Sequence, residues 1–235
     1  MKKIFPTVSS LLLVIVLMAS CDNRDIRRVV KEMAEAPVDT TGFVLKTVRT
    51  NDFSVVEVDC FADVTYHQTP AGTPPYVRVR ALREVMEHVS VDVRDGQCGL
   101  FVSRRYRMPD KAVVVADIYA PFVSKFILDG GKCLRLGRLD ISSPLSLEVA
   151  GVGALVADSV SAPEVSVEMV GSCSTDIACV RTGRLRALLD GKCTLVLKGE
   201  CEASFLEYSE EARVDVSGLK SRSAMQRREL KEAGR

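Results

Sequence analysis

The chain has 235 residues and is almost neutral, with 32 basic and 31 acidic side chains and a formal net charge of +1. This balance provides no basic surface of the kind that holds a phosphate backbone, which argues against nucleic acid as a partner. An apolar fraction of 47% is enough to bury a core, so disorder throughout the chain is excluded. Two His residues give little support to His-based catalysis or a His-rich metal site, and we expect no cofactor and no metal.

Residues 1–20 have the pattern of a signal peptide, in which two Lys precede an apolar run over 11–18. The run is shorter than the stretch of about 20 residues that crosses a bilayer as a helix. It ends in Ala-Ser-Cys21, which resembles the lipobox of bacterial lipoproteins, with Met18 where Leu is usual. The resemblance implies cleavage before Cys21 and a lipid on its thiol, which would anchor the chain in the cell envelope, at the outer membrane or cell surface. The alternatives are an ordinary secreted protein or a short membrane anchor.

The next segment, residues 21–50, is mixed in character, and we interpret it as a tether that connects the anchor to the folded domain. Seven Cys follow the tether, an odd number that cannot pair completely within one exported chain. Their spacing contains no CxxC pair, which disfavours a zinc site.

From Phe53 onward, apolar and polar residues alternate with a period of two, as in 55–58, 77–81 and 89–93. Short alternating segments separated by turn residues are typical of an all-β protein. We therefore place an all-β domain over residues 51–219.

An internal repeat of twenty residues defines the expected architecture. Glycines recur at this spacing, and two places after each of them stands Cys or Gly. Coils of this length, stacked at the strand separation of about 4.8 Å, form a parallel β-helix with rungs of about 20 residues. The glycines would mark a corner of each rung, and the residues two places later would form an interior column. The predicted corner is Gly131, Gly151, Gly171 and Gly191, and the predicted column is Cys133, Gly153, Cys173 and Cys193.

The cysteines of this column have more than one interpretation. Cys is a small apolar residue that fills a narrow interior, which is the interpretation we favour. A disulfide between rungs is geometrically open for Cys173 and Cys193, because neighbouring rungs lie about 5 Å apart. A soft-metal site is the third interpretation.

Several segments resemble the GIN-domain family, the auto-transporter adhesin head domain of Bacteroidetes envelope proteins. The resemblance rests on Phe53–Tyr66, Val89–Gly96, Ile118–Phe122 and Val214–Leu219, together with the glycine-marked repeats. It implies a right-handed parallel β-helix on the cell envelope, a role in adhesion, and no catalytic residues to carry over. Residues 220–235 depart from the family pattern, and they form either a short helical cap or a disordered tail.

Parallel β-helices also include polysaccharide lyases and glycosidases, whose chemistry needs paired carboxylates or an acidic calcium cluster. His67 and His88 have no nucleophile motif beside them. We therefore favour a non-enzymatic surface that binds carbohydrate or another envelope protein. The alternatives are a carbohydrate-active enzyme or a purely structural envelope component, and the oligomeric state is left open. The candidate carboxylates for the enzyme alternative are Asp129, Glu148, Asp158, Glu168, Asp176 and Asp190.

Overall fold

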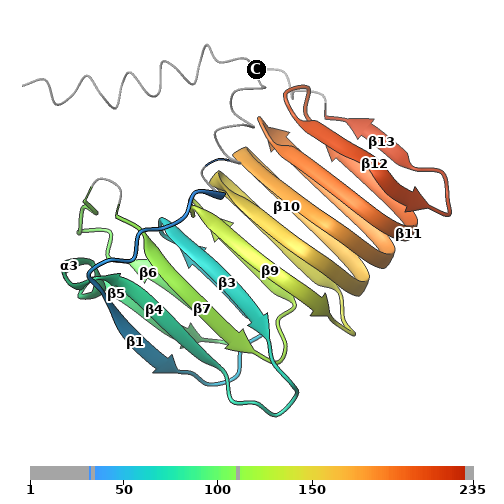
Figure 1. Ribbon diagram of the computed structural model, residues 1–235. Helices are drawn as coiled ribbons and strands as arrows, with labels where there is room; N and C mark the ends of the chain where they lie inside the picture. Colours follow the sequence, from blue (N-terminus) through green and yellow to red (C-terminus); the bar gives the residue numbers. More distant parts are fainter. Residues whose placement is uncertain (1–31, 33–34, 110–111, 231–235) are drawn as a thin grey trace, which may run out of the picture.

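The computed structural model describes residues 32, 35–109 and 112–230, and its fold is all-β (Figure 1). The signal peptide and Cys21 lie outside the described residues. A short helix, α3 (Arg83–Met86), follows the fourth strand. The strands are β1 (Phe43–Arg49), β2 (Val55–Asp59), β3 (Ala62–Gln68), β4 (Tyr76–Leu82), β5 (Val89–Arg94), β6 (Gln97–Val102), β7 (Val114–Ala120), β8 (Lys125–Asp129), β9 (Cys133–Asp140), β10 (Leu145–Gly191), β11 (Thr194–Tyr208), β12 (Arg213–Ser221) and β13 (Gln226–Glu229).

All of these strands belong to one sheet, in the order β1-β4-β7-β3-β9-β10-β8-β2-β6-β5, and β11 continues from β10 to β12 and β13. The sheet is mixed rather than parallel throughout. The pairs β1–β4, β4–β7 and β5–β6 are antiparallel, and the other pairs are parallel. The β5–β6 pair is a hairpin whose turn residues Asp95 and Gly96 have φ of 51° and 76°, as a tight two-residue turn requires.

The C-terminal half contains one very long strand, β10, which has 47 residues. A straight strand of that length would span about 155 Å. Instead, Figure 1 shows β10 as several ribbon segments that lie side by side. Residues about twenty apart in the sequence therefore become neighbours in space. The register pairs Leu147 with Phe126, Ser174 with Thr194, and Thr194 with Arg213. The repeat length is therefore 21, 20 and 19 residues in successive pairings, not a constant twenty.

The core consists of the inward-facing residues of each alternating strand. In β7, for example, Val114, Ala116 and Ile118 are buried. Most of the large buried side chains are aliphatic, which agrees with an aromatic content of only 6%. Phe126 is an exception, and it packs edge-on against Tyr66 with ring centroids 5.0 Å apart. The Tyr66 hydroxyl donates a hydrogen bond to the Ala120 carbonyl at 2.8 Å, so its polar atom is satisfied inside the core.

Two segments that the sequence places outside the folded domain form strands. β1 lies within the predicted tether, residues 21–50, and pairs with β4 along its whole length. β13 lies within 220–235, where we expected a helical cap or a disordered tail, and pairs with β11. Neither segment has a clear apolar alternation: β1 exposes Leu45, and all four residues of β13 are exposed. Their strand structure depends on hydrogen bonding to a neighbour, which a single-sequence pattern does not reveal.

Candidate functional site

The predicted corner glycines adopt backbone conformations that favour glycine, with one shift in position. Gly151, Gly171 and Gly191 have φ of 72°, 103° and 93°. In the first repeat the positive φ belongs to Gly130 instead of Gly131. A Cβ atom on Gly171 would lie 2.8 Å from the Gly151 carbonyl oxygen, so the coil has no room for a side chain at this corner.

The predicted Cys column does not extend to its first member. Cys173 and Cys193 belong to the core, and their Sγ atoms lie 3.6 Å apart. Cys133, however, pairs with Ala154 rather than with Gly153, because the register here is 21 residues. Cys133 is buried on the side of β9 opposite to the core residue Leu134.

The thiols of the described residues are free. Burial raises the pKa of Cys98 to about 12 and that of Cys133 to about 11. The hydrogen bond with Cys193, together with burial, raises the pKa of the Cys173 thiol. Thiols that stay protonated and buried are weak nucleophiles and weak metal ligands, so none of these three is suited to covalent catalysis.

A buried ion group lies where β3 and β9 begin. Asp63 accepts a hydrogen bond from the Lys132 ammonium at 2.9 Å, and its other carboxylate oxygen is bonded by the Arg135 guanidinium. The Lys132 side chain is 6% exposed and that of Asp63 is 11% exposed. Lys132 also donates to the Ala36 carbonyl at 2.8 Å, which fixes the segment that precedes β1 against this end of the sheet.

A row of stacked rings crosses the outer face of β4, β7 and β3. Tyr76, Tyr119 and His67 lie directly opposite one another in these strands, and we call them the aromatic row. The Tyr76 and Tyr119 centroids are 4.5 Å apart, as are those of Tyr119 and His67, and both pairs are within 13° of parallel. The Arg78 guanidinium lies 5.4 Å and 5.6 Å from the centroids of the two Tyr rings, within the range of cation–π attraction.

Asp117 connects the aromatic row to neighbouring charges. Its carboxylate accepts a hydrogen bond from Arg80 Nη2 at 2.9 Å and lies 3.3 Å from His67 Nε2. The His67 side chain is 40% exposed and that of Asp117 is 21% exposed. These contacts orient the His67 ring while leaving part of it open to solvent. The row is therefore a pre-organised polar and aromatic surface.

A cleft of about 860 Å³ opens near the end of the aromatic row. Phe53, Pro121 and Phe122 line it, together with Pro74 and Pro75. The two prolines also line a smaller cleft of about 500 Å³ that reaches Tyr76. The apolar rings and the row of Tyr side chains therefore form one continuous surface.

This surface lies at the end of the sheet away from the buried ion group. Asp63 is the second residue of β3, and the loop that carries Pro74 and Pro75 follows the end of β3. A strand of seven residues spans about 23 Å. Figure 1 shows the loop between β3 and β4 at the lower end of the sheet and the incoming N-terminal segment at the upper end. The cleft thus faces away from the point where the chain enters the domain.

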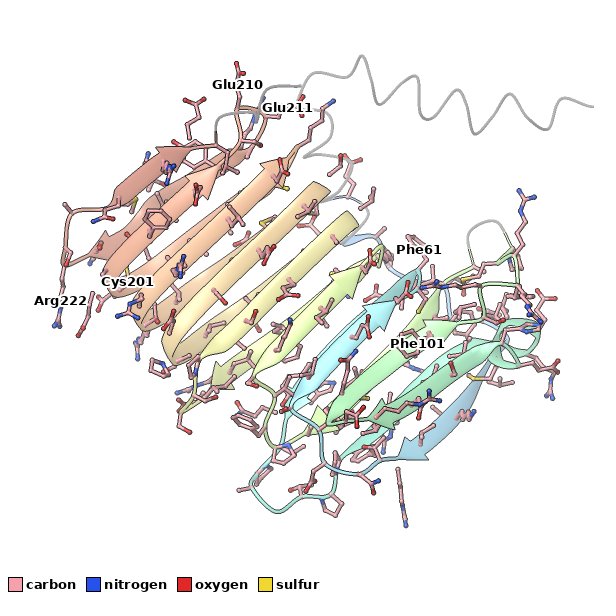
Figure 2. All side chains as sticks on the ribbon, turned by 180° about the vertical axis from the view of Figure 1, so that it is seen from behind. Phe61, Phe101, Cys201, Glu210, Glu211 and Arg222 are labelled. Atoms are coloured by element: carbon pink, nitrogen blue, oxygen red, sulfur yellow. The ribbon has the colours of Figure 1, made fainter. Side chains whose placement is uncertain are left out.

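The candidate carboxylates of the enzyme alternative do not gather into one group. Glu148 is bound by Lys125 at 2.7 Å. Figure 2 shows Glu210 and Glu211 at the turn between β11 and β12, far from Cys201 and Arg222. Among the described residues, no three His, Cys, Asp or Glu side chains are grouped closely enough to hold a metal ion. The remaining candidates lie exposed along the outer face, at Asp129, Asp158, Glu168, Asp176 and Asp190.

Sequence reasoning missed the aromatic row and the buried ion group. The alternation in 77–81 does place Tyr76, Arg78 and Arg80 on one outward face. It does not say which strand lies beside them, and β3 pairs with β7 across about fifty residues. Asp63 and Lys132 are 69 residues apart for the same reason.

The described part of the chain has no helix with the length and apolar character needed to cross a membrane. The comparison with curated proteins finds no relative. Several solved structures are similar to this chain, and two of them have the following similarity. The "putative adhesin from Parabacteroides distasonis" has a TM-score of 0.66 and 13% identity, over 80% of this chain and 78% of that one. The "putative adhesin from Parabacteroides merdae" has a TM-score of 0.51 and 12% identity, over 81% of this chain and 97% of that one.

The comparison with protein families gives a match over most of the chain. Residues 52–227 match the model described as "Putative auto-transporter adhesin, head GIN domain". The match begins just before β2 and ends within β13, so it includes the aromatic row, the cleft and the repeated C-terminal strands. The chain therefore belongs to the family of the auto-transporter adhesin head GIN domain.

Proposed function

We propose that this protein is a cell-envelope lipoprotein whose adhesin-like domain binds its ligand without chemical conversion. The observation that carries the proposal is the continuous surface formed by the aromatic row and the adjoining cleft. It combines apolar rings, charged groups and partial exposure, which suits reversible recognition. The names given to the family and to the two solved structures support an adhesin-like role at the cell surface.

The finer architecture that we propose for residues 125–229 is a right-handed parallel β-helix. The support for it is that parallel strands pair at intervals of 19 to 21 residues from β8 to β13. A stack of this kind makes a rigid, elongated body. The antiparallel strands β1, β4 and β5 would then belong to the first end of the stack, where the ligand surface lies.

The ligand we propose is a carbohydrate or another envelope protein, and the orientation of the domain favours either. The contact between Lys132 and Ala36 would hold the lipid-anchored end of the chain at one side of the sheet. The cleft at the opposite side would then face away from the membrane. No nucleic acid is involved in this proposal, because the net charge is close to zero.

The lipid anchor has a direct test. Cells that express the full chain and receive radioactive palmitate should incorporate label into the protein, and Cys21→Ala should abolish it because the acylated thiol is gone. Cys179→Ala removes a half-buried thiol elsewhere and should keep the label. If the unaltered chain takes up no label, the lipoprotein proposal is wrong.

The binding function is tested with the purified full chain and a panel of acidic and neutral polysaccharides, with and without calcium. We expect retention on one or more polysaccharides without shortened products. Phe122→Ala removes an apolar ring that lines the cleft and should weaken retention at least about fivefold. Leu188→Ala trims a comparably exposed side chain on β10 and serves as the control. Release of cleaved products would establish the enzyme alternative, and blank polysaccharide and protein arrays would favour a purely structural role.

A further inference from the structure

The outer face of β1, β4, β7 and β3 carries more positive than negative charge. Figure 1 shows these four strands side by side. Arg49 of β1 and Arg78 of β4 are exposed, and the Arg80 side chain is 41% exposed. The four strands contain two acidic residues, Asp117 and Asp63, and Asp63 belongs to the buried ion group. The face is therefore locally positive, although the chain as a whole is almost neutral.

Arg78 has no carboxylate partner of its own. It stands opposite Asp117 in the register of β4 and β7. The Asp117 carboxylate, however, is bound by Arg80 at 2.9 Å. The Arg78 guanidinium lies instead over the two Tyr rings of the aromatic row, and it forms no ion pair within the described part of the chain. Stacking uses the flat face of a guanidinium group, so the N–H donors at its edge remain available.

A second cation, Arg49, lies beside the same rings. Arg49 is directly opposite Tyr76 in the antiparallel pair of β1 and β4. Both residues line the smaller cleft, whose lining contains no acidic side chain, and Arg49 forms no ion pair with a described residue. Arg49 and Arg78 are diagonal neighbours, which in an antiparallel pair stand about 7–8 Å apart at the backbone. Like charges at this distance repel each other, and an anionic ligand would remove that repulsion.

The Tyr hydroxyl groups of the aromatic row add neutral donors to the two guanidinium groups. Tyr76 and Tyr119 are half-buried, and their hydroxyl groups have no hydrogen-bond partner among the described residues. A phenol hydroxyl donates to an anionic oxygen and also accepts from a sugar hydroxyl. The larger cleft differs, because Asp52 is part of its lining. The place that suits an anionic group is therefore the smaller cleft together with Arg78.

We propose that Arg49 and Arg78, with Tyr76 adjacent to both, form a subsite for the anionic groups of an acidic polysaccharide. The anionic group is a uronate carboxylate or a sulfate ester. This inference rests on the proposed binding function and selects acidic over neutral polysaccharides. A guanidinium group binds an oxyanion through two parallel N–H donors, and such charge-assisted hydrogen bonds are stronger than neutral ones.

The alternative occupant is an acidic segment of a partner protein, and the composition of the face disfavours it. The centre of a protein–protein interface is apolar, and charged residues are depleted there. Leu45 is the only large aliphatic side chain that β1, β4, β7 and β3 expose, and it pairs with Arg80. A polysaccharide needs no apolar centre of this kind, because hydroxyl groups cover its surface.

The experiment measures the affinity of the purified full chain for two acidic polysaccharides and for their neutral forms. One pair is polygalacturonate and its methyl ester, and the other is a sulfated galactan and its desulfated form. Binding of at least one acidic polymer should be at least tenfold tighter than binding of its neutral form. It should also weaken at least about fivefold when the ionic strength rises about tenfold, because salt screens the charges. The pair that shows the difference distinguishes carboxylate from sulfate.

Variants connect this preference to the two Arg residues. Arg78→Gln and Arg49→Gln each remove one charge and should weaken binding of the retained acidic polymer at least about tenfold. Arg78→Lys keeps the charge without the planar fork and should weaken it less. The matched control is Arg186→Gln on β10, which removes an exposed Arg whose guanidinium lies 6.0 Å from the Phe205 ring centroid, and it should leave binding unchanged. Circular dichroism of each variant should match that of the unaltered chain.

The results separate the subsite from the binding function. If the acidic and neutral forms bind equally, or if Arg78→Gln and Arg49→Gln bind as tightly as the unaltered chain, the subsite is wrong. Weaker binding by Phe122→Ala would then show that the binding function stands. An equal loss in Arg186→Gln would mean that overall charge holds the polymer, which also overturns the subsite. If the chain retains acidic proteins and no polysaccharide, the ligand class is wrong, and if it retains neither, the binding function fails as well.

Discussion

Replacing Asp63 by Ala should lower the free energy of unfolding by about 3–5 kcal/mol, the usual result of leaving one partner of a buried ion pair alone. Lys132 would remain in a position where its side chain is only 6% exposed, with the Ala36 carbonyl as its remaining acceptor. Arg135 would lose its carboxylate partner as well. The cost arises mainly from the unpaired charge of Lys132, because that ammonium group has little access to water.

Urea unfolding of the full chain, followed by circular dichroism, measures this effect. Asp63→Leu combined with Lys132→Met removes both charges and should be less destabilising than Asp63→Ala alone. The matched control is Asp92→Ala, which breaks the exposed ion pair with Arg94 and should change stability by less than about 1 kcal/mol. Equal effects of Asp63→Ala and Asp92→Ala would mean that the Asp63–Lys132 pair is solvated and not buried.

Much of the β-strand content could be predicted from local patterns, because alternation with period two depends only on nearby residues, whereas β1 and β13 show no such alternation. The twenty-residue spacing of glycines coincides with positive φ at Gly151, Gly171 and Gly191, but in the first repeat the positive φ belongs to Gly130. The mixed sheet of the N-terminal half has no such repeat. In this half β1 pairs with β4 and β3 pairs with β7. The paired strands are far apart in the sequence, so tertiary packing and not a local pattern determines which strands are neighbours.

The candidate site was less predictable than the fold for the same physical reason. Tyr76, Tyr119 and His67 each occupy an outward position of an alternating strand, and any one of them is an ordinary surface residue. Stacking at 4.5 Å arises only when three strands lie side by side in one register.

The constant twenty-residue period fails where the pairing of β10 with β11 changes register. Between Ile177 and Val180 the pairing of β10 with β11 shifts, and Gly199 becomes the partner of Val180, 19 residues away. Gly199 has a φ of 120°, and a Cβ atom there would lie 2.1 Å from the Val180 carbonyl oxygen and 2.5 Å from its nitrogen. Both contacts are with backbone, which cannot rotate away as a side chain can.

Gly199→Ala should therefore lower the free energy of unfolding by about 3 kcal/mol, the combined cost of an unfavourable backbone conformation and of overpacking. Gly137→Ala adds the same methyl group where nothing lies within 4 Å, and it should change stability by less than about 0.5 kcal/mol. Paired urea titrations of the two variants give the difference directly. If Gly199→Ala is as stable as Gly137→Ala, Gly199 is not in close contact with the Val180 backbone. The register shift between Ile177 and Val180 would then be wrong, and β10 would pair with β11 at the uniform twenty-residue period.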